Sequence, residues 1–139
     1  MVFGLYNIYN WYNVIGYLKN GYTTWQEAGK PEDLISTITA KEFAEKLLNN
    51  GTELNVLDVR KPSEYEDRHL QDIANYPLDY INNWTNSLDK TKTYYVHCAG
   101  GYRSAITESI LKSRNIHNVI DVAGGYGAIK TELQSDNIN

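Results

Sequence analysis

The sequence predicts one α/β domain with a small, mostly parallel sheet and helices on both faces. Three short apolar runs, rich in β-branched and aromatic residues, are typical of buried strands: residues 54–59, 93–97 and 117–122. Segments with helical periodicity separate these runs, and strands that alternate with helices pair in parallel. At 139 residues the chain is long enough for one hydrophobic core and too short for two complete domains.

The first helix of this domain is predicted over residues 40–49. Thr39 followed by Glu42 forms a capping-box pattern, and Gly51 stands where glycine is favoured after a helix. One apolar stripe gives the helix a face for the core: Phe43, Leu47 and Leu48. The strand at 54–59 follows directly.

Two helical segments are predicted next. Pro62 breaks the chain and opens a short helical turn through Glu66. After Pro77, residues 79–87 are predicted to be helical because apolar side chains recur at helical spacing: Leu78, Ile81, Trp84 and Leu88.

The last third of the chain repeats the alternation of strand and helix. A tight loop follows the strand at 93–97 and leads into a helix predicted over 104–114, with the apolar side chains Ile106, Ile110 and Leu111 on one face. After the strand at 117–122, two glycines form a turn, and residues 126–133 are predicted to close the domain as a helix.

Composition restricts the partners and the compartment. The net charge of −4, the pI near 5.3 and the lack of a Lys and Arg cluster argue against binding to nucleic acid or an anionic membrane. A single cysteine forms no internal disulfide, and the amino terminus lacks signal-peptide features, which predicts a cytoplasmic protein. His69, His97 and His117 lack metal-ligand spacing, so no metal or other cofactor is expected.

The sequence CAGGYRS, residues 98–104, places the one cysteine of the chain in the loop after the second predicted strand. A working cysteine needs surroundings that favour a thiolate. Gly100 and Gly101 allow the backbone to turn around the sulfur, so that amide N–H groups and a helix start at about Ser104 stabilise an anion there. Arg103 adds planar donors, suited to an oxyanion or to an acidic partner that clamps the loop. The alternative interpretation is a cysteine that only packs in the core.

Three segments resemble the rhodanese sulfurtransferase domain in order and spacing: VLDVRKPSEYEDRHL (56–70), YYVHCAGGYRSA (94–105) and NVIDVAGGYGA (118–128). The resemblance implies that Cys98 accepts a sulfane sulfur, holds it as a persulfide and passes it to a thiol or another nucleophile. It also implies three groups of site residues, which are Cys98 and Arg103 as catalytic, Ala99, Gly100, Gly101, Tyr102 and Ser104 as substrate-binding, and Asp58, Arg60 and Glu64 as supporting residues.

Ala99 departs from many thiosulfate-using members of that family, which carry an arginine directly after the cysteine. With less positive charge, the loop favours a persulfide of a low-molecular-weight thiol or of a partner protein over doubly charged thiosulfate. Two other functions stay open, a noncatalytic interaction module and a dual-specificity phosphatase on the same fold. The phosphatase loop has one more residue between cysteine and arginine than the four found here, residues 99–102.

Neighbours of the loop have simpler explanations than catalysis. His97 precedes Cys98 in a strand, so the two side chains point to opposite faces, and His97 is expected to be hydrogen-bonded within the sheet. Tyr102 either walls a pocket or projects into solvent.

The charged supporting residues are expected to form ion pairs. Asp58 is predicted to pair with Arg60 or Arg103, and Asp58 together with Glu64 is predicted to order Arg103.

Residues 1–30 are predicted to be the end of a preceding copy of this fold plus a linker, and residues 31–139 the complete domain. Val-Ile leading to Gly-Tyr occurs in residues 14–22 and again, one residue shorter, in residues 119–126; chance similarity is the alternative. The segment GYTTWQEAGKP (21–31) also resembles the carboxyl end of a rhodanese domain. Tandem copies with this ending resemble the carboxyl-terminal half of fusion proteins that join a metallo-β-lactamase-type persulfide dioxygenase to rhodanese domains. This implies an oxygenase and a rhodanese-like region as missing partners. The physiological sulfur donor and the oligomeric state stay open.

Overall fold

The computed structural model describes residues 16–50, 53–133 and 137–139. The chain divides into two compact units, residues 1–34 and residues 35–139. The strand expected near residues 14–15 and the helix-ending Gly51 lie outside the described residues.

In the described part of the first unit, residues 16–34, the chain forms one short helix, α1 (Tyr22–Glu27). Asn20 and Gly21 precede it with positive φ values of 62° and 55°. The indole nitrogen of Trp25 donates to the Pro31 carbonyl oxygen at 3.0 Å and ties the helix to the segment that follows. Because α1 has no buried residue, local bonds rather than a core hold its shape.

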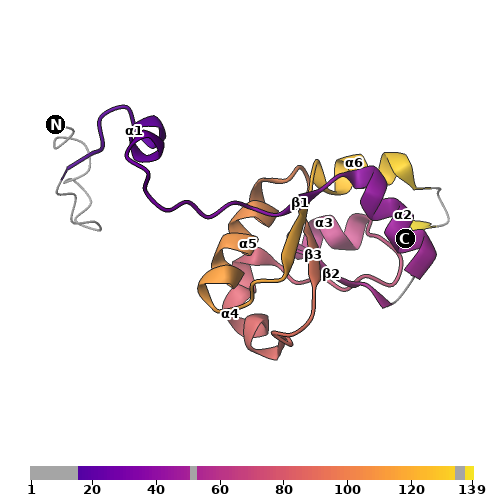
Figure 1. Cartoon of the computed structure of the whole chain (residues 1–139). Coiled ribbons are helices and arrows are strands. Elements are labelled where there is room, and N and C mark those ends of the chain that lie inside the picture. Colours follow the sequence, from indigo (N-terminus) through magenta and orange to yellow (C-terminus); the bar gives the residue numbers. More distant parts are fainter. Residues whose placement is uncertain (1–15, 51–52, 134–136) are drawn as a thin grey trace. The chain divides into compact units, whose positions relative to one another are not determined.

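The second unit is built on a four-stranded parallel sheet (Figure 1). The order across the sheet is β1-β4-β3-β2, and the strands are β1 (Thr37–Ile38), β2 (Asn55–Asp58), β3 (Tyr94–His97) and β4 (Val119–Val122). The parallel α/β architecture is therefore confirmed. Strand β1 was not predicted, because two residues carry no periodicity; hydrogen bonds from the Asp121 and Ala123 N–H groups to the carbonyls of Ser36 and Ile38 place it.

Helices cover both faces of the sheet, as predicted. Helices α2 (Ala40–Asn50) and α6 (Gly125–Glu132) pack on one face, and α4 (Ile81–Trp84) and α5 (Tyr102–Ser113) pack on the other (Figure 1). The remaining helix, α3 (Pro62–Asp67), follows β2.

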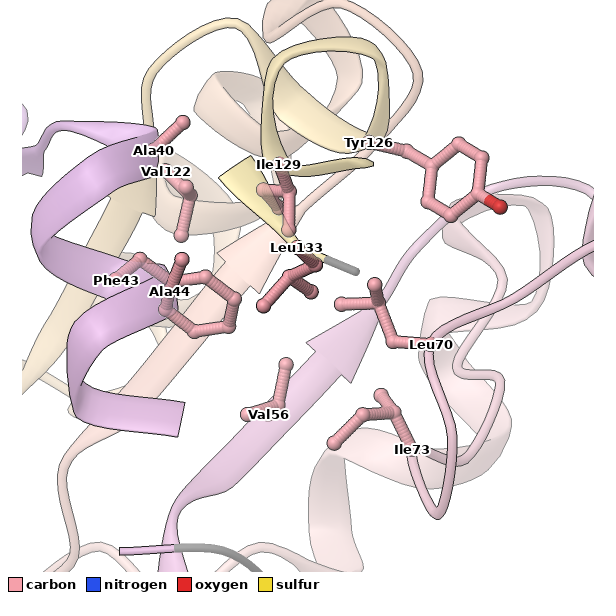
Figure 2. Packing of buried hydrophobic residues seen from close by; sticks show 10 residues of the cluster. All are labelled: Ala40, Phe43, Ala44, Val56, Leu70, Ile73, Val122, Tyr126, Ile129 and Leu133. Carbon is pink, nitrogen blue, oxygen red and sulfur yellow. The ribbon is translucent and has the colours of Figure 1, made fainter. Parts of the chain in front are cut away.

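The first hydrophobic core lies between the sheet and the α2–α6 pair. Figure 2 shows Phe43 and Ala44 of α2 close to Leu133 and Ile129, above Val56 of β2. Phe43 and Ile129 are completely buried. This packing explains the apolar stripe of the first predicted helix.

The second core lies on the α5 face. Leu57, Val96 and Val119 of the three longer strands pack there with Leu111 of α5, and the same cluster includes Cys98. Neighbouring residues of a strand point to opposite faces, so each of these short strands contributes to both cores.

Residues 79–87 do not form the single helix that was predicted. The segment consists of a 3-10 turn, η2 (Leu78–Tyr80), the single α turn α4, and a second 3-10 turn, η3 (Thr85–Ser87). Tyr80 and Trp84 have φ of −115° and −114°, which depart from helical values and interrupt the hydrogen-bond ladder. The expected apolar face still packs in the second core: Leu78, Ile81, Trp84 and Leu88.

The helix starts follow the capping chemistry of the sequence. The Thr39 N–H donates to the Glu42 carboxylate at 3.0 Å, and the Glu42 N–H donates to the Thr39 hydroxyl at 3.2 Å, which confirms the capping box. Helix α5 starts at Tyr102 rather than Ser104, because Gly101 caps it with a φ of 107°. Among the described residues, no helix has the length and apolar character required to cross a membrane.

Candidate functional site

Cys98 is the first residue after β3, and its side chain belongs to the core on the α5 face. His97 points to the opposite face, where its Nε2 lies 3.8 Å from Oδ2 of Asp58. The two adjacent side chains therefore do not form a Cys–His pair.

The loop between β3 and α5 turns a backbone donor toward the sulfur. The Gly101 N–H donates to Cys98 Sγ at 3.0 Å, and the Ser104 hydroxyl oxygen lies 3.5 Å from the same sulfur. Gly101 adopts the left-handed φ that the sequence led us to expect. Gly100 does not have a positive φ, and a Cβ there would meet nothing within 4 Å. The prediction that the turn also requires a glycine at position 100 is therefore wrong.

These contacts favour a thiolate over a thiol. Burial raises the pKa of the Cys98 thiol, but hydrogen bonds from the Ser104 hydroxyl and from the N–H groups of Ser104, Gly101 and Gly100 act against it. Together they place the pKa below its ordinary value. The amino-terminal end of the 12-residue helix α5 faces the same loop, and its dipole acts in the same direction.

The start of α6 holds the loop from the other side. The Tyr126 N–H donates to the Cys98 carbonyl oxygen at 2.6 Å, and the Gly127 N–H donates to the Ala99 carbonyl oxygen at 3.1 Å. A Cβ at Gly125 would collide with the Cys98 carbonyl oxygen and lie 2.9 Å from that of Ala99. Gly125 was predicted only as part of a turn; the structure shows that its missing side chain lets α6 approach the cysteine loop.

Arg103 is clamped by Glu64. Its two terminal nitrogens donate to the two Glu64 carboxylate oxygens at 2.6 and 2.8 Å, and the Lys61 N–H donates to Glu64 Oε2 at 3.1 Å. The Arg103 hydrogen bonds are the main cause that lowers the pKa of Glu64 to about 2. The predicted role of Glu64 in ordering Arg103 therefore has a direct contact behind it.

Asp58 binds the other arginine. Arg60 Nη2 donates to Asp58 Oδ2 at 2.6 Å and Arg60 Nε donates to Oδ1 at 3.0 Å, while the guanidinium lies 4.0 Å above the Tyr126 ring. The prediction that Asp58 helps to hold Arg103 is corrected: its bonds go to Arg60, two residues away and equally buried. His97 is completely buried beside them, and within the described residues its ring nitrogens have no hydrogen-bond partner, contrary to expectation.

The sulfur lies below an exposed stretch of loop. Cys98 is 1% exposed, whereas Ala99 and Gly100 are exposed. Tyr102 is 81% exposed, so of the two positions considered for it, the structure shows the one in solvent. A reactant that reaches the sulfur must therefore present a narrow terminal group.

Two carboxyl groups behind the loop were not singled out from the sequence. Glu108 of α5 is completely buried and Asp121 of β4 is 7% exposed, and burial raises the pKa of both. Asp121 follows Val119 by two residues and so shares the sheet face of Cys98. The sequence signal that could have identified Asp121 was a carboxylate at an inward-facing position of an apolar strand.

The site has the chemistry of a nucleophilic sulfur surrounded by donors. Within residues 16–50, 53–133 and 137–139, no group of three or more His, Cys, Asp or Glu side chains is arranged to hold a metal ion. The loop can stabilise a negative charge on Cys98 or on one atom attached to it, since backbone N–H donors and the helix start face that position.

Relatives of known name match this region. The chain is 31% identical over 91 residues to the putative sulfur carrier protein YrkF of Bacillus subtilis. The matched region covers 66% of this chain and 49% of that protein. It is 29% identical over 103 residues to the probable adenylyltransferase/sulfurtransferase MoeZ of Mycobacterium tuberculosis, covering 73% of this chain and 26% of that protein. The matches thus span half or less of these relatives.

A solved structure and a family model agree with the architecture. A rhodanese-like domain protein from Staphylococcus aureus superposes with a TM-score of 0.63 at 33% identity, covering 68% of this chain and 91% of that chain. The family model of the rhodanese-like domain matches residues 39–132, which include the cysteine loop and its supporting residues. The chain therefore belongs to the rhodanese-like domain family.

Proposed function

We propose that this domain is a sulfurtransferase that moves sulfane sulfur through a persulfide on Cys98. The observation that carries the proposal is the Gly101 N–H bond to Cys98 Sγ at the start of α5, since it supports negative charge at the sulfur. Two relatives are named as a putative sulfur carrier protein and a probable adenylyltransferase/sulfurtransferase, which supports the same reaction class.

The reaction divides into two displacements at sulfur. The Cys98 thiolate attacks the outer sulfur of a donor; the sulfur–sulfur bond of the donor breaks, and its electron pair leaves with the donor thiolate, which takes a proton from solvent. The new Cys98 persulfide keeps one negative charge beside the loop donors. An acceptor thiolate then attacks the outer sulfur and releases the Cys98 thiolate.

The charges around the loop favour a persulfide donor over thiosulfate. Ala99 contributes no charge, and the charge of Arg103 is balanced by the two short bonds to Glu64. A donor with two charges on its reacting group therefore meets little net positive charge, whereas a persulfide group carries a single charge and a protruding sulfur. Such a narrow group also suits the recessed position of Cys98.

The test compares donors and a matched pair of variants. Glutathione persulfide is expected to load Cys98 faster than thiosulfate at equal concentration, and Ala99→Arg to raise loading from thiosulfate at least about tenfold, because it adds one charge near the sulfur. Cyanide should release thiocyanate from loaded wild type and none from Cys98→Ser. Equal or faster loading from thiosulfate would contradict the donor assignment. Absence of thiocyanate would favour the noncatalytic module or the phosphatase.

We also propose that residues 1–30 are the end of a preceding copy of the fold. Asn20 and Gly21, which precede Tyr22, have positive φ values of 62° and 55°, as do Gly124 and Gly125, which precede Tyr126, with 75° and 55°. Tyr22 is 57% exposed, as expected for a side chain whose packing partners belong to the missing part of that copy.

Limited proteolysis tests this organisation. A glutamate-specific protease is expected to cut after Glu32, next to Lys30, well before Glu132 of α6, if the leading segment lacks its packing partners. Equal resistance at the two glutamates would count against a severed copy.

A further inference from the structure

Tyr126, the second residue of α6, contacts the cysteine loop with its backbone and a buried arginine with its ring. Its N–H donates to the Cys98 carbonyl oxygen at 2.6 Å. The guanidinium carbon of Arg60 lies 4.0 Å from the centroid of its ring, a distance typical of a cation–π contact. The Tyr126 hydroxyl is buried and has no hydrogen-bond partner in the part of the chain that the structure describes. The ring face, rather than the hydroxyl, therefore gives this side chain its specific partner.

The guanidinium of Arg60 is fixed by hydrogen bonds on its other sides. It donates to the two carboxylate oxygens of Asp58 at 2.6 and 3.0 Å. It also donates to the carbonyl oxygen of Glu64 in α3 at 3.4 Å and to that of Arg68, directly after α3, at 3.0 Å. A planar cation whose donors are bound at several points has little freedom to move. A ring that packs on this cation is held in place as well.

The start of α6 in turn fixes the orientation of two peptide units in the cysteine loop. The Cys98 carbonyl accepts from the Tyr126 N–H, and the Ala99 carbonyl accepts from the next N–H of α6 at 3.1 Å. In a planar trans peptide the N–H points opposite to the C=O, so the N–H groups of Ala99 and Gly100 point away from α6. The Cys98 side chain lies on that side, in the core under α5. The position of α6 thus determines how the loop faces the sulfur.

We propose that Tyr126 is a positioning residue for the sulfur of Cys98: its ring, seated on the Arg60 guanidinium, fixes the backbone N–H that orients the cysteine loop. The inference rests on the proposed sulfur transfer, in which the loop must keep its donors toward the thiolate and then toward the persulfide. The Tyr126 hydrogen bond goes to the Cys98 carbonyl and not to the sulfur, so Tyr126 acts through the main chain.

A ring that only fills the core is the alternative role for Tyr126. It belongs to the first core, and Figure 2 shows it at the edge of that cluster, well apart from Phe43 and Ala44 of α2. Phe43 is a second aromatic ring of the same core and is completely buried. Its ring partner is Tyr95, at a centroid distance of 5.8 Å, rather than a cation. Phe43 therefore supplies a matched control for the loss of an aromatic ring.

The pH dependence of Cys98 alkylation tests the inference, because the chain has no other cysteine and the rate follows the thiolate fraction. Tyr126→Leu keeps the backbone N–H and an apolar side chain but removes the ring face. Its midpoint should lie about 0.5 to 1 pH unit above that of wild type, which slows alkylation below the midpoint about three- to tenfold. Tyr126→Phe, which keeps the ring, should restore the wild-type midpoint.

The control variant separates positioning from packing. Phe43→Leu should lower the stability of the domain and leave the midpoint of Cys98 alkylation at its wild-type value. An unchanged midpoint in Tyr126→Leu, or an equal shift in Phe43→Leu, overturns the inference.

A second variant covers the case in which Tyr126→Leu fails to fold. Arg60→Met/Asp58→Asn removes the cation under the ring, leaves no buried charge unpaired and keeps the net charge of the protein. Its midpoint should also rise by about 0.5 to 1 pH unit, and a wild-type midpoint in this variant overturns the inference. Alkylation needs no sulfur donor, so a raised midpoint without persulfide formation in wild type would reject the proposed function alone. Persulfide formation with an unchanged midpoint in Tyr126→Leu would reject the positioning role alone.

Discussion

The sheet carries a buried polar cluster on each face near its carboxyl end, and the two clusters differ in how their acids are paired. Under α6, Asp58 is bonded to Arg60, and the guanidinium lies on the Tyr126 ring. Under α5, Asp121 is buried on the sheet face of Cys98, and no arginine or lysine pairs with it in the described part of the chain. A buried acid that is paired with a cation is held in its charged form, whereas a buried acid without such a partner favours its protonated form.

Breaking the paired cluster should have the largest effect. Arg60→Met leaves Asp58 buried without its cation, and the free energy of unfolding should fall by about 3–5 kcal/mol. Urea denaturation measures this. The double variant Arg60→Met/Asp58→Asn removes both charges and should recover most of the loss. A cost below about 1 kcal/mol for the single variant would show that the pair is not needed for the fold.

Forcing the start of α6 away from the cysteine loop should have the next largest effect. Gly125 has a φ of 55°, and a Cβ there would press on the carbonyls of Cys98 and Ala99. Gly125→Ala is expected to cost about 2–3 kcal/mol and to slow alkylation of Cys98, because the loop must move. Gly100→Ala, with open space around it, should change stability by no more than about 0.5 kcal/mol. Equal costs for the two alanines would contradict the close approach of α6.

The partly exposed ion pair of Glu64 and Arg103 contributes a smaller, pH-dependent amount to stability. The pKa of Glu64 is lowered from its ordinary 4.5 to about 2, so its contribution to stability is complete above pH 4.5 and is lost as the pH falls towards 2. Because both side chains are partly exposed, solvent screening reduces this contribution to about 1 kcal/mol.

Unfolding of Glu64→Gln and wild type over this pH range checks the contribution. The variant should be less stable than wild type at neutral pH, and the difference should vanish at about pH 2. A difference that stays constant with pH would assign the loss to packing rather than to charge.

Neutralising Asp121 should have the smallest effect, and this change should raise the free energy of unfolding rather than lower it. The pKa of Asp121 is raised by burial, so the folded state holds this proton more tightly than the unfolded chain, and stability falls as the pH rises above the ordinary range of aspartate. Asp121→Asn should be more stable than wild type at about pH 8, by up to about 1 kcal/mol. A loss of several kcal/mol in thermal or urea unfolding would mean that the carboxylate is needed structurally.

The fold was predictable because its signals are local. Continuous apolar strands, the Thr39–Glu42 capping box and the glycine turns each depend on a few neighbouring residues, and all agree with a parallel sheet. Strand β1 was missed because two residues show no pattern. The helix over 79–87 was overpredicted because apolar spacing describes a buried face equally well when the backbone is a series of short turns.

The site was predictable only where chemistry is adjacent in sequence. Cys98, Gly101 and Arg103 lie within one loop, and spacing alone indicates an anion-binding turn. The approach of α6 to the cysteine loop at Gly125, and the position of Asp121 on the sheet face of Cys98, depend on which strands and helices lie side by side. Such long-range contacts have no local sequence pattern.

Intact mass after exposure to a low-molecular-weight persulfide is the most direct test of sulfur transfer by this domain. Wild type should gain the mass of one sulfur atom and lose it on addition of a thiol acceptor. The Cys98→Ser variant should show neither change. Wild type that is folded but keeps its original mass, or Cys98→Ser that gains sulfur equally, would contradict the assignment of the reaction to Cys98.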